Sequence, residues 1–161
     1  MYPGTYATQA PDKIAAVMAG TGETVSYGEL QRRSAQLAHV LYDAGLRPGD
    51  VVALLTENSL RAFEVYWAAM RSGLFITAVN NRLKPDEVAY IVSDSGATAL
   101  IVSAELAATA EAIAAQTTGV KLRLAYGGPV QGHDRYEEYS MVEPSGWSAK
   151  GSAEAAAMVS S

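Results

Sequence analysis

Residues 46–79 read LRPGDVVALLTENSLRAFEVYWAAMRSGLFITAV, and this stretch decides the fold that we predict for the chain. A Pro-Gly turn leads into residues 51–55, VVALL, whose unbroken apolar run is typical of a strand buried on both faces of a sheet. A helix is expected between Asn58, which can act as its N-cap, and Gly73, which can end it in the left-handed conformation. Residues 74–79, LFITAV, predict a second buried strand. Strand, helix and strand in this order form a right-handed βαβ unit, so the two strands should be parallel.

The alternation of strand and helix continues toward the C-terminus. Pro85, followed by two acidic residues, is typical of a helix start, and this helix should run to Gly96. Residues 97–102 predict a third strand, residues 104–116 an alanine-rich helix, and residues 120–126 a fourth strand. Repeated βαβ units build a mostly parallel sheet with helices on its faces, so the predicted fold class is α/β.

A β-hairpin and a helix precede the βαβ units. Two short apolar segments, residues 14–19 and 24–27, flank the sequence GTGE, which favours a tight reversal of the chain. Ser26 and Glu29 have the spacing of a capping box, in which each side chain bonds to the other residue's backbone N–H. The leucines that follow recur at helical spacing and predict a helix over residues 27–44.

The composition excludes several classes of protein. The chain has 161 residues with 12 Lys+Arg and 17 Asp+Glu, a formal net charge of -5, which argues against a nucleic-acid-binding face. The absence of cysteine excludes disulfides, zinc-thiolate sites, iron–sulfur clusters and thiol catalysis. The N-terminus lacks the pattern of a signal peptide, and the apolar runs are far shorter than the ~20 residues that a transmembrane helix needs. We therefore expect a cytoplasmic protein with no transmembrane segment and no nucleic-acid partner.

Four large apolar side chains of the helix after Asn58 invite two interpretations. Phe63, Tyr66, Trp67 and Met70 could line a hydrophobic ligand site. Their helical spacing is also what packing a helix onto a sheet requires, and we expect them in the core.

Four motifs that suggest chemistry have simpler explanations. The G-x-G at residues 20–22 precedes a strand, so it is interpreted as a hairpin turn and not as a dinucleotide fingerprint. Residues 127–129, GGP, lack the Lys-Ser/Thr of a P-loop. His39 has no second ligand at helical spacing and should lie at the surface. His133 and Asp134 have no nucleophile motif beside them and are expected in a surface loop.

The segment NNRLK at residues 80–84 is the most suggestive one. It follows a predicted parallel strand, and α/β sheets bind ligands at the carboxyl ends of such strands. The two asparagines also suit a turn, and Arg82 could instead pair with a nearby carboxylate. Arg82 is therefore a weak candidate for a cofactor-binding residue. The residues by themselves identify no catalytic residue and no metal ligand.

Six short motifs occur in a fixed order along the chain. They are TVSYGEL at 24–30, LRPGDVVAL at 46–54, ENS at 57–59, AMRSG at 69–73, NRL at 81–83 and YIVSDSGA at 90–97. Their order and spacing resemble the N-terminal part of the adenylate-forming enzymes, the AMP-binding superfamily of acyl-CoA synthetases, luciferases and peptide-synthetase adenylation domains. The segment at 80–83 is most similar to bacterial fatty-acyl-CoA synthetases.

The resemblance covers residues 6–126 and implies a chemistry that needs more than these residues. Enzymes of this kind use ATP and Mg²⁺ to convert a carboxylic acid, such as a fatty acid, to an acyl-adenylate, and then pass the acyl group to the thiol of CoA. Their phosphate-binding loop, metal-site motif, ribose-binding Asp and catalytic Lys lie downstream of the matched region, so no ATP, Mg²⁺ or CoA site is expected in this chain. Lys84 stands where the family usually has Ser or Thr, which removes the expected N-cap of the following helix.

The resemblance predicts two regions and a function. Residues 1–144 should form part of the AMP-binding N-terminal domain, and the Ser/Ala-rich residues 145–161 a disordered tail. The leading hypothesis is an N-terminal fragment of an ATP-dependent acyl-CoA synthetase that is inactive alone, and the alternative is a stand-alone α/β binding or interaction module without catalysis. Because a sheet cut from a larger one leaves an edge and apolar faces uncovered, we also expect self-association.

Overall fold

A computed structural model of the chain describes residues 3–140. The helices are α1 (Pro3–Gln9), α2 (Tyr27–Asp43), α3 (Leu60–Arg71), α4 (Pro85–Asp94), α5 (Ala107–Ala112) and α6 (Tyr136–Ser140). The strands are β1 (Ile14–Val17), β2 (Thr24–Ser26), β3 (Val51–Leu55), β4 (Phe75–Val79), β5 (Ala97–Ser103), β6 (Leu122–Tyr126) and β7 (Asp134–Arg135). Two 3₁₀ turns, η1 (Ala104–Leu106) and η2 (Ala114–Gln116), flank α5.

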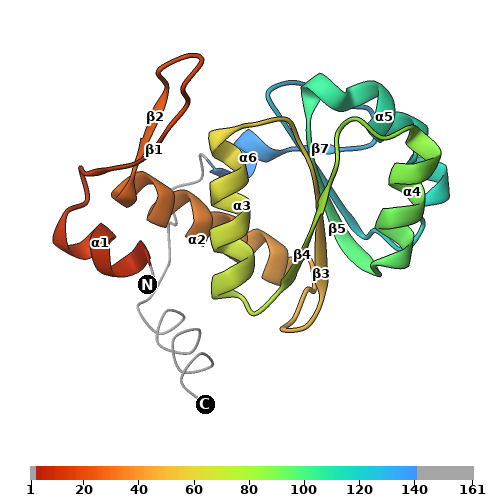
Figure 1. Cartoon of the computed structure of the whole chain (residues 1–161). Helices are drawn as coiled ribbons and strands as arrows, with labels where there is room; N and C mark the ends of the chain where they lie inside the picture. The colour runs from red at the N-terminus through yellow and green to blue at the C-terminus, as the bar shows by residue number, and fades with distance from the viewer. Residues whose placement is uncertain (1–2, 141–161) are drawn as a thin grey trace.

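The core of the molecule is a five-stranded parallel sheet in the order β4-β3-β5-β6-β7. Helices α2, α3 and α6 cover one face and α4 and α5 cover the other (Figure 1). Each face has its own cluster of buried side chains, with Leu54 and Ile101 on the first face and Leu55 and Leu100 on the second. These alternate residues of β3 and β5 point to opposite faces, as the uninterrupted apolar runs predicted. The predicted α/β class is confirmed.

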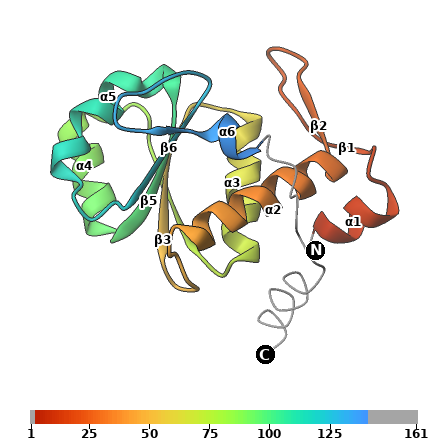
Figure 2. The same cartoon turned by 180° about the vertical axis from the view of Figure 1, so that it is seen from behind.

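The N-terminal hairpin and helix also form as predicted. Strands β1 and β2 pair antiparallel and project beside α2 (Figure 2). Ser26 Oγ accepts a hydrogen bond from the Glu29 N–H at 3.2 Å, and Glu29 Oε2 accepts one from the Ser26 N–H at 3.1 Å. The Ser26 N–H bond to the Glu29 carboxylate is the largest cause of the lowered pKa of Glu29. The capping box is therefore confirmed, and Gly45 takes the left-handed conformation (φ 97°) just beyond the helix.

Strand β4 departs from the prediction, which made it a strand buried on both faces. It lies at the edge of the sheet with β3 as its one neighbour among the described strands, and Phe75 is 65% exposed. The apolar run specifies a strand but not its place in the sheet, because the order of strands depends on the crossover connections.

Helix α3 differs from its prediction in two ways. Its N-cap is Ser59, whose Oγ accepts from the Arg61 N–H at 3.2 Å, and not Asn58. The predicted core face is also wrong for three residues, because Phe63, Tyr66 and Met70 are exposed. Trp67 alone of that set is partly buried, against the cluster beneath the hairpin. The residues that α3 buries are instead Leu60, Glu64, Val65, Ala68 and Ala69.

The remaining differences concern short elements. The predicted helix over residues 104–116 is broken into η1, α5 and η2. Helix α4 begins at Pro85 as predicted, and the Lys84 side chain makes no cap, while the Glu87 carboxylate accepts from the Lys84 N–H at 2.9 Å. Elements α1, β7 and α6 were not predicted. No helix within residues 3–140 is long and apolar enough to cross a membrane. The predicted tail, residues 145–161, lies outside the described residues.

Candidate functional site

The order of the strands creates a switch point at the carboxyl edge of the sheet. Strands β3 and β5 are neighbours, yet the chain leaves β3 toward α3 on one face and leaves β5 toward α5 on the other (Figure 1). In open α/β sheets, ligands bind in the crevice that these diverging loops create. This edge is therefore the place where the fold predicts a functional site.

Hydroxyl groups from several strands meet at this edge. The hydroxyls of Thr56, after β3, and Tyr126, at the end of β6, are hydrogen-bonded to each other. Burial raises the pKa of Tyr126, and hydrogen bonds with Thr56 and Ser59 offset part of that effect. Ser103, which is buried at the end of β5, uses its Oγ to accept from the Glu105 N–H at 3.3 Å. The hydroxyls thus bond mainly to the protein itself and hold the strand ends together.

The loop after β4 brings Arg82 to the same edge. Asn81 Nδ2 donates to the carbonyl oxygen of Thr56 at 3.2 Å, which ties this loop to the end of β3. Asn80 Oδ1 accepts from the Arg82 N–H at 2.9 Å, the turn geometry that the two asparagines suggested. The Arg82 side chain is exposed and makes no ion pair with any residue from 3 to 140. Arg82 is therefore a cation at the carboxyl edge with its guanidinium available, and a ligand role for it remains a prediction.

The other sequence candidates do not converge on this edge. His39 lies exposed on α2, and the glycines at 20–22 form the hairpin turn, with Gly22 at a φ of 74°. His133 precedes β7 and is half-buried, which lowers its pKa. At the end of β6, the N–H of Gly127 donates to Glu137 Oε1 at 2.8 Å. This N–H is therefore already bonded within the protein and is not free to bind a phosphate.

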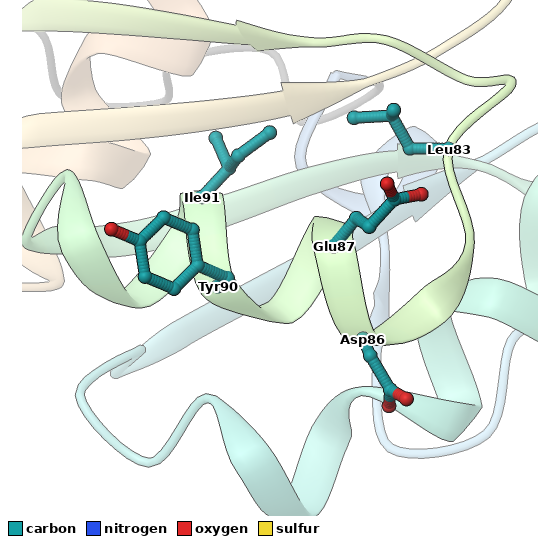
Figure 3. Close-up of a pocket in the computed structure, with 5 residues that line it drawn as sticks. All are labelled: Leu83, Asp86, Glu87, Tyr90 and Ile91. Atoms are coloured by element: carbon teal, nitrogen blue, oxygen red, sulfur yellow. The ribbon is translucent and has the colours of Figure 1, made fainter.

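A pocket of about 410 Å³ lies beside α4 and the loop that precedes it (Figure 3). It is lined by Leu83, Asp86, Glu87, Tyr90 and Ile91. Two of its five lining residues are carboxylates, which repel phosphate groups. This pocket is therefore unsuited to a nucleotide.

The structure also contains a buried ionic cluster that the sequence analysis missed. Glu64 of α3 is fully buried, and its carboxylate accepts from Arg33 of α2 at 3.1 Å, from Arg61 at 3.1 and 3.2 Å, and from the Tyr136 hydroxyl of α6 at 2.9 Å. Burial, followed by the charge of Glu64, raises the pKa of Tyr136 well above its ordinary value. The cluster joins three helices on one face of the sheet. The one sequence signal for this cluster is the spacing of opposite charges along a helix, which indicates ion pairs. It occurs between Glu29 and Arg33 and between Arg61 and Glu64.

The described residues do not fit the ATP and Mg²⁺ that adenylate-forming enzymes use. Within residues 3–140 no three His, Asp or Glu side chains are grouped so that they could hold a metal ion. The glycines at 127 and 128 are followed by a proline, and the loop that carries Arg82, residues 80–84, contains no glycine.

A parallel sheet wound in both directions from β3, with helices on both faces, defines an open doubly wound α/β domain. Within that class, the chain belongs to a specific family. The sequence model of the family described as AMP-binding enzyme matches residues 5–157. The resemblance to adenylate-forming enzymes is thereby confirmed.

Relatives within the family include two acyl-CoA ligases. Feruloyl-CoA synthase of Amycolatopsis sp is 40% identical over 114 residues, which are 71% of this chain and 23% of that protein. Long-chain-fatty-acid–CoA ligase FadD13 of Mycobacterium tuberculosis is 34% identical over 110 residues, 68% of this chain and 22% of that protein. The crystal structure of the N-terminal domain of FACL13 from Mycobacterium tuberculosis is similar with a TM-score of 0.68 at 32% identity, over 74% of this chain and 31% of that chain. The chain thus matches less than a quarter of the length of these two relatives.

Proposed function

We propose that this chain supplies the N-terminal part of the adenylating domain of an ATP-dependent fatty-acyl-CoA ligase. The complete enzyme would activate a fatty acid as its acyl-adenylate with ATP and Mg²⁺, release pyrophosphate, and transfer the acyl group to CoA in the cytoplasm. The match of the AMP-binding family over residues 5–157 carries this proposal. The NRL segment at 81–83 and the long-chain-fatty-acid–CoA ligase among the relatives support the choice of a fatty acid.

The role of the described residues in such an enzyme is structural support. The bonded hydroxyls of Thr56 and Tyr126 and the Asn81 bond to β3 fix the strand ends from which the family's ligand sites would be built. Rigid strand ends matter because catalytic groups lose rate when their geometry loosens by about 1 Å. Arg82 is the one residue of this edge that we assign a direct ligand role, as a contact for an anionic substrate group.

Catalysis itself would require groups that these residues do not offer. Adenylation develops charge on the α-phosphate and pyrophosphate, and enzymes stabilise it with positioned cations, a metal and backbone amides. Removing one such group typically costs about 10²–10³ in rate, and here several are absent together from residues 3–140. We expect the chain alone to be inactive.

The test is fatty-acid-dependent exchange between ATP and pyrophosphate by the purified 161-residue chain. We expect no exchange above a heat-inactivated control. Exchange that depends on the fatty acid and is abolished in Arg82→Ala, but retained in the matched variant Arg32→Ala, would overturn the assignment of a supporting role. Arg32 is a suitable control because it is also exposed, and it lies on α2 and not in the loop that follows β4.

A further inference from the structure

Five large apolar side chains are exposed on β4 and on the two helices that flank it. They are Phe63, Tyr66 and Met70 of α3, Phe75 of β4 and Tyr90 of α4, each between 38% and 67% exposed, and we call them the β4 edge surface. Helix α3 flanks β4 on one face of the sheet, and α4 flanks it on the other (Figure 1). Exposed apolar side chains thus occur on the edge strand and on a helix at each face of the sheet, and exposed apolar surface of this kind marks interaction sites.

The backbone of β4 is open along the same edge. The N–H of Phe75 donates to the Asp50 carbonyl oxygen at 2.9 Å on the β3 side. Because successive residues of a strand direct their backbone groups to opposite sides, the N–H and C=O groups of Ile76 and Ala78 point away from β3. Among residues 3–140 no strand pairs with that side. These groups are therefore available for a further strand.

Nothing in the sequence of β4 protects it from such pairing. Its five residues, FITAV, include no charge and no proline, and its register with β3 has no bulge. The opposite edge is different, since β7 has only two residues, Asp134 and Arg135, and both are charged. Short, charged edges are how proteins prevent edge-to-edge association, and long, apolar edges promote it. Among the strands that the structure describes, the sheet therefore has one protected edge and one open edge.

We infer that the β4 edge is an interface with a second copy of this chain, formed by antiparallel pairing of two β4 strands about a two-fold axis at Thr77. In this register Ile76 of each copy lies opposite Ala78 of the other, and the outward N–H and C=O groups form four backbone hydrogen bonds. Phe75 lies opposite Val79 of the second copy, and both are uncharged. The two sheets become one continuous sheet. Because each copy uses its one open edge among residues 3–140 in this contact, the assembly stops at a dimer.

The area of the surface suits a reversible dimer. With about 200 Å² for each fully exposed large side chain, the five residues bury roughly 500 Å² per copy. Specific interfaces bury about 800 Å² per partner on average, and weak, transient ones bury less than about 600 Å². An area of this size is typical of weak association, so the dimer should dissociate on dilution. The inference does not depend on the proposed enzymatic function.

The experiment is light scattering coupled to size exclusion, with the full chain at a series of concentrations. We expect the mass to rise with concentration from 16.9 kDa to twice that value. Amide hydrogen exchange of Ile76 and Ala78 should slow over the same range, because only the dimer bonds their N–H groups. Phe75→Lys and Ala78→Pro should each weaken dimerisation about tenfold or more. Ala78→Pro removes an N–H that the fold of one copy does not use.

The matched control is Val17→Lys, which makes the same change at an exposed strand residue of the hairpin. It should leave the dimer unchanged, and far-UV circular dichroism should report the same fold for all variants. A chain that stays monomeric at every concentration would overturn the inference, as would folded Phe75→Lys and Ala78→Pro variants that dimerise like the wild type. Slow exchange of Ile76 and Ala78 that does not change with concentration would assign the edge to a segment of the same polypeptide and would also overturn self-pairing.

Discussion

Replacing Tyr136 by phenylalanine should destabilise the chain by about 2 kcal/mol. The substitution removes one hydrogen bond, 2.9 Å long, from the Tyr136 hydroxyl to the buried carboxylate of Glu64. Hydrogen bonds to charged groups contribute about 1.5–3 kcal/mol, and Glu64 keeps its bonds to Arg33 and Arg61, so its charge remains compensated. Glu64→Gln should cost more, about 3 kcal/mol, because it leaves two guanidinium groups facing a neutral amide.

A double-mutant cycle measured by urea unfolding checks this reasoning. If the hydroxyl acts on the carboxylate, Tyr136→Phe should cost about 1 kcal/mol less in the Glu64→Gln background than in the wild type. Tyr139→Phe is the control, because the Tyr139 hydroxyl lies in the same helix but is exposed and makes a long contact of 3.5 Å to Asp134. A cost for Tyr136→Phe no larger than that for Tyr139→Phe, or strictly additive effects of Tyr136→Phe and Glu64→Gln, would refute the role assigned to the cluster.

The same hydroxyl predicts a dependence on alkaline pH. Burial raises the pKa of Tyr136 in the folded state above its unfolded value of about 10. Its contribution is therefore complete below about pH 10 and is lost as the pH rises through the folded-state pKa. The wild type should lose its stability advantage over Tyr136→Phe in that range, and an advantage that stays constant would contradict the assignment.

Two further predictions concern other parts of the fold. Ser26→Ala should lower stability by about 0.5–2 kcal/mol in thermal melts, because the start of α2 loses its cap, and an unchanged melting temperature would mean that the helix begins elsewhere. Burial lowers the pKa of His133 in the folded state, so below about pH 6.5 the unfolded chain binds a proton that the folded chain does not, and the free energy of unfolding falls. In His133→Gln the free energy of unfolding should therefore fall less steeply with decreasing pH than in the wild type.

Local signals in the sequence were sufficient for most of the fold. The capping box at Ser26 and the apolar run at β3 each depend on residues close in sequence, and both formed as predicted. Helix α3 shows that such local signals do not predict which side of a helix faces the sheet. The helical period identified its large apolar residues, but the small residues Ala68 and Ala69 face the sheet, where they allow close approach, and Phe63 and Met70 stay outside.

The parts that were missed depend on contacts between distant residues. Glu64 is buried because Arg33 and Tyr136, 31 and 72 residues away in the sequence, supply its partners. Helix α6 has too few residues to give a periodic pattern, and it is fixed by Tyr136. The exposed edge of β4 likewise follows from the order of the strands, which a single strand's composition does not encode. Arg82, in contrast, lies at the carboxyl edge where the strand-loop pattern placed it.

The most direct test of the central claim is a hybrid ligase. Residues 3–140 of this chain would replace the corresponding N-terminal segment of the long-chain-fatty-acid–CoA ligase of Mycobacterium tuberculosis, to which the chain is 34% identical over 110 residues. The measurement is acyl-CoA formation from a long-chain fatty acid, ATP and CoA, with circular dichroism to verify folding. If these residues form the supporting N-terminal part of an acyl-CoA ligase, the folded hybrid forms acyl-CoA. A folded hybrid that binds ATP and fatty acid but forms no acyl-CoA would contradict that claim.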